Sequence, residues 1–285
     1  MTPAEGKYFA ADSAFEIEEE RLQLVEAYGD AITLRHLDAI GVVPGSRCLE
    51  VGAGRGSVAR MLAERVGPNG RVVATDINPR FLSHLKAANV EVRQHNILID
   101  PLDGPYDLVH SRYLLEHLSE PEKALRHMVH ALRPGGVLLA EASDALCFGS
   151  ADDASPNAGA LQTLTAALTE VVSVSGVVDP FFGRKLLRLL SDAGLRDVRA
   201  EVHLDISRGA SERARLLRMT IETLRGLVVR SGRLTELELD AGLAVLDDPR
   251  ASIMSMATVS AVGHTSADET PVPEALVGSP RITTR

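Results

Sequence analysis

The residues that decide the fold are 46 to 62, "SRCLEVGAGRGSVARML". An apolar segment, Arg47 to Val51, runs into a glycine-rich turn, and a helical pattern begins at Ser57. Glycines in such a turn let the backbone approach a ligand, and the N-terminus of the following helix offers free N–H groups. The stretch therefore predicts a strand, a turn and a helix that together hold a nucleotide.

Downstream of this stretch, short apolar segments alternate with helical patterns. Strands are predicted at residues 47–51, 71–77, 90–96, 106–111 and 136–143, and helices at 57–66, from Pro79 onward, at 112–118 and at 121–136. This alternation implies a parallel sheet with helices on both faces. We therefore predict an α/β fold.

The segments on either side of this alternation are predicted to be mainly helical. Residues 14–40 carry apolar side chains at helical spacing, and residues 211–247 are predicted to form two helices. A helix over 180–195, a strand over 196–207 and a last strand over 251–265 complete the pattern. We expect a helical cap over 1–40, a domain over 41–264 with helical insertions at about 145–178 and 211–247, and a disordered tail over 265–285.

Composition narrows the class of protein. The chain has 285 residues and a formal net charge of −9, which disfavours a nucleic-acid partner because phosphate backbones repel an acidic surface. No apolar run approaches the length of a membrane span, and the acidic N-terminal stretch lacks a signal-peptide core, so we expect no membrane partner and a cytoplasmic protein. The only cysteines, Cys48 and Cys147, are too few for a disulfide framework or a zinc cluster.

The flanks of the glycine turn discriminate between nucleotides. Gly52, Gly54 and Gly56 are spaced G-x-G-x-G, and Ser57 follows where a dinucleotide fold expects glycine or alanine. Glu50 lies two residues before the first glycine, where a carboxylate disfavours a pyrophosphate and suits a ligand with a nearby ammonium group. No Gly-Lys-Ser/Thr follows, which excludes a P-loop.

These features resemble the class I S-adenosylmethionine (SAM) dependent methyltransferases over roughly residues 40–145. The matching motifs, in order, are "LEVGAGRG", "VVATDINP", "VRQHNIL", "YDLVHSRYLLEHL" and "LRPGGVLLAEA", and "GPNGRVVATDINPRFL" is similar to the quinone- and natural-product-methylating subset. The resemblance implies a Rossmann-like seven-stranded sheet, mostly parallel with an antiparallel last strand, plus helical cap insertions. It implies SAM as the cofactor and S-adenosylhomocysteine (SAH) as its product.

The resemblance also implies which residues bind the cofactor. Asp76 occupies the position that binds the ribose hydroxyls, and Asn96 stands where an acidic side chain usually accepts the adenine amino group. An amide oxygen can still accept that bond. The implied cofactor residues are Glu50, Gly52, Ala53, Gly54, Gly56, Asp76, Ile77, Asn96, Ile97, His110, Ser111 and Arg112.

Candidates for chemistry follow the fourth predicted strand. His110 is the first candidate for a general base by position, and His117 is the second. Arg112 is expected either to hold the SAM carboxylate or an acidic substrate, or to pair with Glu116 at i, i+4. The cap segments are expected to form an apolar substrate pocket, with Tyr8, Tyr113, Phe148, Phe181 and Phe182 as candidate walls.

We therefore expect a SAM-dependent methyltransferase that acts on a small aromatic or natural-product-like molecule at oxygen, without a metal. The chain lacks the Asn/Asp-Pro-Pro-Tyr/Phe loop of nucleic-acid amino methyltransferases and the carboxylates of a catechol-type metal site. Methylation of a quinone or amine at carbon or nitrogen, or SAM/SAH binding without methyl transfer, stays open. An NAD-dependent oxidoreductase is disfavoured by Glu50 and Ser57. Helices within 211–247 are candidates for a homodimer contact.

Overall fold

The computed structural model describes residue 10 and residues 14–267. Its main feature is a sheet in the strand order β3-β2-β1-β4-β5-β10-β7. The strands of this sheet are β1 (Arg47–Val51), β2 (Arg71–Asp76), β3 (Val90–Gln94), β4 (Tyr106–Arg112), β5 (Leu132–Asp144), β7 (Arg196–His203) and β10 (Ala257–His264). Strand β10 runs antiparallel to both β5 and β7, while β1 to β5 pair in parallel. The predicted seven-stranded sheet with an antiparallel last strand is confirmed.

Helices cover both faces of this sheet. On one face, α1 (Phe15–Ile40) and α2 (Ser57–Val66) enclose a core that contains Leu37, Leu62 and Cys48. On the other face, α3 (Pro121–His130) and α5 (Leu186–Asp192) enclose a second core around β4, β5 and β10. The inner strands β1, β2, β4 and β5 are buried along most of their length, as expected for parallel strands covered on both faces, whereas the edge strands β3 and β7 are mostly exposed or half-buried.

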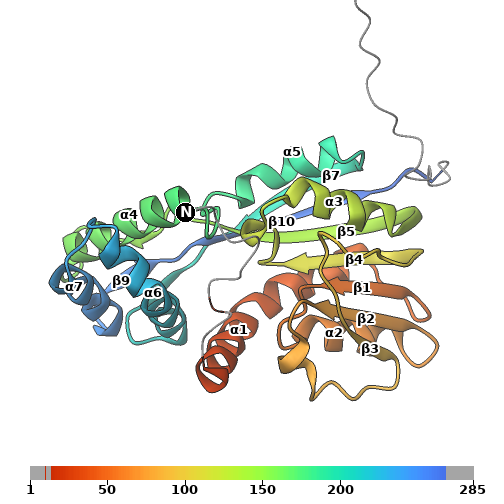
Figure 1. Ribbon diagram of the computed structural model, residues 1–285, viewed down its shortest axis with the longest axis horizontal. Helices are drawn as coiled ribbons and strands as arrows, with labels where there is room; N and C mark the ends of the chain where they lie inside the picture. The colour runs from red at the N-terminus through yellow and green to blue at the C-terminus, as the bar shows by residue number, and fades with distance from the viewer. Residues whose placement is uncertain (1–9, 11–13, 268–285) are drawn as a thin grey trace, which may run out of the picture.

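A third core forms the cap, outside the sheet. Its helices are α4 (Ala158–Ser175), α6 (Glu212–Arg230) and α7 (Glu236–Asp247), and its small sheet has the order β6 (Gly149–Ser150), β9 (Ser252–Met254), β8 (Ile206–Arg208). Figure 1 shows these elements beyond one end of the large sheet, with α1 lying beside α6. Ser211 caps α6, and Thr235 with Glu238 forms a capping box on α7.

Some predicted elements differ from the observed ones. The helix predicted from Pro79 is only a 3₁₀ turn, η1 (Pro79–Leu82), and the one predicted over 112–118 is only η2 (Leu115–His117). The segment after η1 is short, and the Asn89 side chain donates to the carbonyls of Ala63 and Gly67, which returns the chain to the end of α2. These side-chain bonds fix the connection without a helix.

The long strands predicted near the C-terminus are also interrupted. Residues 196–207 form β7 and the start of β8, and residues 251–265 form β9 and β10. Strands β8 and β9 pair with each other in the cap, whereas β7 and β10 pair in the main sheet. Each of the two predicted strands therefore has one part in the main sheet and one part in the cap. Because the alternation of apolar and polar residues continues through both parts, the sequence does not show where one strand ends and the next begins.

Candidate functional site

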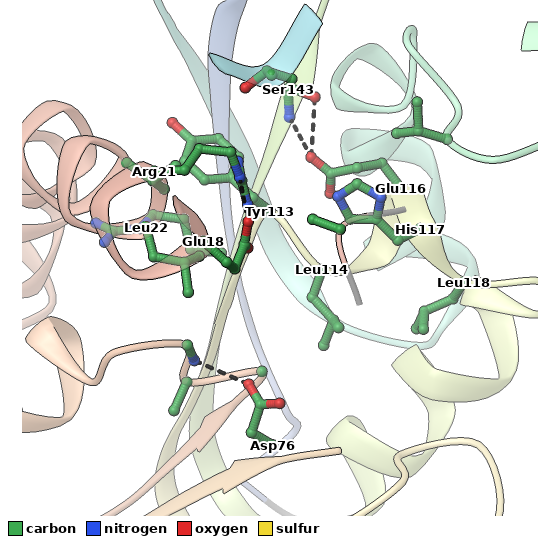
Figure 2. Close-up of a pocket in the computed structure, with 18 of the residues that line it drawn as sticks. Glu18, Arg21, Leu22, Asp76, Tyr113, Leu114, Glu116, His117, Leu118 and Ser143 are labelled. Carbon is green, nitrogen blue, oxygen red and sulfur yellow. Dashed lines mark hydrogen bonds and ion pairs between the residues drawn. The ribbon is translucent and has the colours of Figure 1, made fainter. Parts of the chain in front are cut away.

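A cavity of about 630 Å³ opens at the carboxyl ends of β1, β2, β4 and β5. The glycine turn after β1 forms its floor, α1 one side, and helices α4 and α6 of the cap another. It lies where the strand order reverses between β1 and β4, the usual ligand position in open α/β sheets. Figure 2 shows the α1 side chains facing the turn that follows β4 across this space.

The glycine turn has a backbone that favours glycine. Gly52, Gly54 and Gly56 have φ angles of 74°, 55° and 85°, in the left-handed region. The Gly54 N–H donates to Asp76 Oδ2 at 3.0 Å, and the Asn78 N–H donates to Asp76 Oδ1 at 2.8 Å. Burial raises the pKa of Asp76 and outweighs these donors. The carboxylate at the end of β2 therefore holds the turn and faces the cavity, as Figure 2 shows.

The ends of β2 and β3 form a second part of the cavity wall. Ile77 is 53% exposed and Ile97 only 4%, yet both line the cavity. Asn96 Oδ1 accepts the Leu98 N–H at 3.0 Å, so its side chain also shapes the loop. Sequence reasoning missed His95, which lines the cavity with both ring nitrogens buried and without a partner among the described residues. Its position next to Asn96, a predicted cofactor residue, could have identified it as a candidate for the cavity wall.

His110 lies inside the sheet, not in the cavity. Its Nδ1 is 2.5 Å from Glu50 Oε2, and its Nε2 is 3.1 Å from Glu141 Oε2. Burial alone would lower the pKa of His110, but the two carboxylates raise it to about 9. Of these three residues only Glu50 lines the cavity. The geometry is against the prediction that His110 is the general base, because both nitrogens are already bound. Ser111 is likewise buried and does not line the cavity.

Arg112 anchors α1 to the sheet. Its Nη1 donates to Thr33 Oγ1 at 2.8 Å, and its Nη2 donates to Asp30 Oδ1 at 2.9 Å and to Ser57 Oγ at 3.3 Å. The expected pairing with Glu116 is wrong, because these acceptors occupy the guanidinium. The Arg112 side chain still borders the cavity.

The turn after β4 brings further polar groups to the cavity. Glu116 Oε1 accepts both the N–H and the hydroxyl of Ser143, each at 3.0 Å, as Figure 2 shows. Burial raises the pKa of Glu116 to about 7. Burial and the charge of Arg21 lower the pKa of His117 to about 4. Tyr113 has a φ of 53°, rare for an aromatic residue, and its hydroxyl is 2.5 Å from Thr258 Oγ1.

The candidate substrate walls are only partly where the sequence predicted them. Phe148 and Tyr113 line the cavity. Phe182 is 3% exposed in the core of the main sheet, and Phe181 lies under the Arg184 guanidinium, so neither lines the cavity and both predictions are wrong. Tyr8 lies outside the described residues. The apolar wall comes instead from α4 and α6, through Leu168, Val172, Leu216, Leu217, Ile221 and Leu224.

Helix α1 contributes charged and aromatic groups. Arg21 donates twice to the Glu18 carboxylate, at 2.9 and 2.8 Å, and both side chains are buried at the cavity. The Arg213 guanidinium of α6 lies 3.4 Å from the ring centroid of Tyr28, a cation–π contact. The contact between Arg213 and Tyr28 joins the cap to α1 at the cavity wall.

The residues present fit SAM. Its ammonium and sulfonium are cationic, and Glu50 presents a carboxylate beside the glycine turn. Asp76 offers a carboxylate to ribose hydroxyls, and the nitrogens of His95 are buried without a described partner. A Cβ at Gly52 would lie 3.1 Å from the Leu114 side chain, so the turn is already closely packed. Among residue 10 and residues 14–267, no cluster of side chains is arranged to hold a metal ion.

Comparison with known proteins gives the class of protein that the sequence motifs predicted. A family model described as a methyltransferase domain matches residues 24–200, more than half of the chain. An uncharacterised 37.1 kDa transposon protein of Streptomyces fradiae is 32% identical over 164 residues, which is 55% of this chain and 46% of that protein. The ubiquinone/menaquinone biosynthesis C-methyltransferase UbiE of Ectopseudomonas mendocina is 37% identical over 112 residues, which is 36% of this chain and 44% of UbiE. The chain thus spans less than half the length of these relatives.

Solved structures share the fold. A cyclopropane-fatty-acyl-phospholipid synthase-like protein of Lactobacillus casei matches with a TM-score of 0.54 at 18% identity, covering 92% of this chain and 95% of that one. The YcgJ protein of Bacillus subtilis matches with a TM-score of 0.53 at 15% identity, covering 81% and 96%. At these identities the likeness concerns the fold alone. In residues 14–267, no helix has the length and apolar character to cross a membrane.

Proposed function

Because the chain belongs to the class I SAM-dependent methyltransferases, we propose that it transfers a methyl group from SAM to an oxygen atom of a small organic molecule. The observation that carries this proposal is one cavity with two kinds of wall. Its floor is the polar glycine turn with Glu50 and Asp76, and its roof is the apolar face of α4 and α6. A charged cofactor and an apolar substrate therefore meet in the same space.

We assign the cofactor to the floor. Glu50 would hold the amino-acid ammonium, Asp76 would accept from the ribose hydroxyls, and Asn96 with Ile77 would bind the adenine. His110 acts on the cofactor through Glu50, because its ring fixes that carboxylate from below. SAM supplies the electrophilic methyl group when bound. The protein's part is to orient the substrate in line with that methyl group and to exclude water, to which the apolar side chains of α4 and α6 contribute.

The roof suits an aromatic or natural-product-like substrate. Helices α4 and α6 present leucine, isoleucine and valine side chains, and Phe148 adds an aromatic edge. Few charged groups face this part of the cavity, which favours shape and apolar area as the basis of recognition. The relatives named C-methyltransferases keep methylation at carbon as a second candidate.

The first experiment is a thermal-shift titration with SAM, SAH, NAD and NADP. A ligand at about 100 times its dissociation constant adds roughly 2.7 kcal/mol to the free energy of unfolding. We expect a rise with SAM and SAH alone; a rise with NAD alone would contradict the proposal. Labelled SAM with a panel of phenols, enols, quinones and amines then tests transfer. Binding of SAM without transfer to any of them would favour a SAM-binding protein instead.

A further inference from the structure

Neither of the two histidines expected to act as a base, nor the nearby phenol of Tyr113, is suited to accept a proton from the substrate. Both nitrogens of His110 are bound by carboxylates, away from the cavity. His117 borders the cavity, but its pKa is about 4, lowered by burial and by Arg21, so its ring is a weak base. The Tyr113 hydroxyl is bonded to Thr258 and burial raises its pKa, so the phenol stays neutral.

Glu116 differs from all three. It lies in η2, directly after β4, and borders the cavity although it is only 4% exposed. Its Oε1 is fixed by the N–H and the hydroxyl of Ser143. Its Oε2 is buried and has no hydrogen-bond partner among the described residues. A buried polar atom without a partner is costly, which is why such atoms in native proteins call for an explanation.

We propose that Glu116 is the general base of methyl transfer, and that the substrate is a weakly acidic phenol or enol whose hydroxyl hydrogen-bonds to Glu116 Oε2. This inference rests on the function proposed above. In the step, the Glu116 carboxylate takes the hydroxyl proton while the hydroxyl oxygen bonds to the methyl carbon. The C–S bond breaks with its electron pair on sulfur, giving SAH, a methyl ether and a protonated Glu116 that later releases its proton to water.

Two features of the site support this role. Two donors from Ser143 hold one oxygen of the carboxyl group, so the other keeps a fixed direction, as a positioned base requires. Burial also brings the pKa of Glu116 to about 7, with the negative charge of Asp179 acting in the same direction. A base is most effective when its pKa is close to the working pH, and an ordinary exposed glutamate is too weak. A free amine, by contrast, would need no base.

The test compares E116Q with the wild type on two substrates of similar shape. One is the phenol that the wild type methylates fastest in the panel; the other is its nitro derivative, which ionises near neutral pH without help. E122Q is the matched control, because Glu122 is exposed on α3 and does not border the cavity. We expect E116Q to lower the rate of methylation of the parent phenol by about 10²- to 10⁴-fold, the usual contribution of a general base. The rate of methylation of the nitrophenol should fall far less, and the affinity for SAH should not change.

A structural role would give another pattern. Equal losses on both phenols, or a loss of SAH affinity in E116Q, would overturn the inference while methyl transfer stands. Methylation of amines but of no phenol or enol would overturn it as well. If the wild type binds SAM but methylates nothing, the proposed function fails first and the inference fails with it.

A second readout needs no turnover. In the SAH complex, an infrared titration should show a protonated-carboxyl band that disappears as pH rises through about 7. The band should be absent from E116Q and present in E122Q. A wild-type spectrum in which no carboxyl titrates in this range would contradict the proposal.

Discussion

At the scale of single residues, His110 is the clearest case of a side chain whose role depends on distant partners. It pairs in register with Glu50 of β1, and Glu141 of β5 approaches its other nitrogen. Position at the end of a strand predicted a base. It could not show that the ring points into the sheet, because that depends on the register between strands far apart in sequence.

We predict that His110→Asn destabilises the protein by about 3–5 kcal/mol, the usual cost of removing one partner of a buried charged pair. The reason is that the carboxylates of Glu50 and Glu141 would lose the imidazolium that contacts both of them, and the charge of Arg112, which acts on both without bonding to either, would not replace it. Urea denaturation measures this loss. Ser191→Ala, a change on the exposed face of α5, is the control and should alter stability little. A loss no larger than that of the control would show that His110 is not charged in the folded protein.

The same side chain predicts a pH dependence. The pKa of His110 is about 9 in the folded protein and 6.5 without the fold. A raised pKa contributes stability that is complete below about pH 6.5 and is lost as pH rises through about 9. Stability should therefore fall over this window in the wild type and fall less in His110→Asn. Identical slopes in the two proteins would contradict the assigned charge.

Asp76 and Asn96 are predicted to differ in their effect on the cofactor. Asp76→Ala removes a charged acceptor from the cavity and releases the Gly54 N–H, so SAH affinity should fall by about 1.5–3 kcal/mol. Asn96→Ala should cost less, because Asn96 Oδ1 is already engaged by the Leu98 N–H. Isothermal titration calorimetry with SAH gives both values. Small and equal losses would refute the assignment of both positions.

At the scale of elements, α1, α2 and the strands β1 to β4 could be predicted closely, whereas the short turns, the start of β5 at Leu132 within the predicted helix 121–136, and the breaks in the last strands could not. β1 and α2 have the predicted bounds because glycines and a proline mark their ends. The segment after Pro79 has a helical composition but is tied by Asn89 to the end of α2. Phe181 and Phe182 are similar: they were placed in a helix over 180–195, but α5 begins only at Leu186, and the sequence did not show which side chains of this segment face the sheet.

Helix α1 gives a prediction about close packing. A Cβ on Gly29 would lie 2.8 Å from Arg112 Cζ, whose guanidinium is held by Thr33 and Asp30. Gly29→Ala should therefore lower stability and SAH affinity, although alanine in a helix normally gains about 1 kcal/mol over glycine. Gly159→Ala, with open space around its Cβ in α4, is the matched control and should stabilise. A gain at both positions would mean that the Arg112 anchor is loose.

At the scale of the whole molecule, the sequence predicted the sheet and the helical cap segments but not how they enclose one cavity. Helix α1 contacts both α2 and α6, so it connects the core under the sheet with the core of the cap. Such contacts join residues that are far apart in the chain, and no local pattern encodes them. The motifs therefore predicted the class of ligand, but they did not predict that side chains of α4 and α6 would line the cavity.

This arrangement predicts which helices become more protected from hydrogen exchange when a ligand binds. SAH should slow amide hydrogen exchange in α1 and α6, which border the cavity, and leave α7 unchanged because none of its residues borders it. Mass-resolved exchange of peptides from these helices measures the effect. Slowing in α7 equal to that in α6 would instead indicate that the cap tightens as a unit.

The contacts of Ser57 have one more consequence. Its N–H, at the start of α2, donates to Glu26 at 3.0 Å, and its hydroxyl donates to Asp30 at 2.7 Å. That helix start is where a dinucleotide fold receives a pyrophosphate. Here the carboxylates of Glu26 and Asp30, both from α1, occupy this position. They accept the hydrogen bonds that a phosphate would accept, and their negative charge would repel a phosphate group. We therefore expect the protein to discriminate against phosphorylated nucleotides and to favour a cofactor that carries no phosphate at this position.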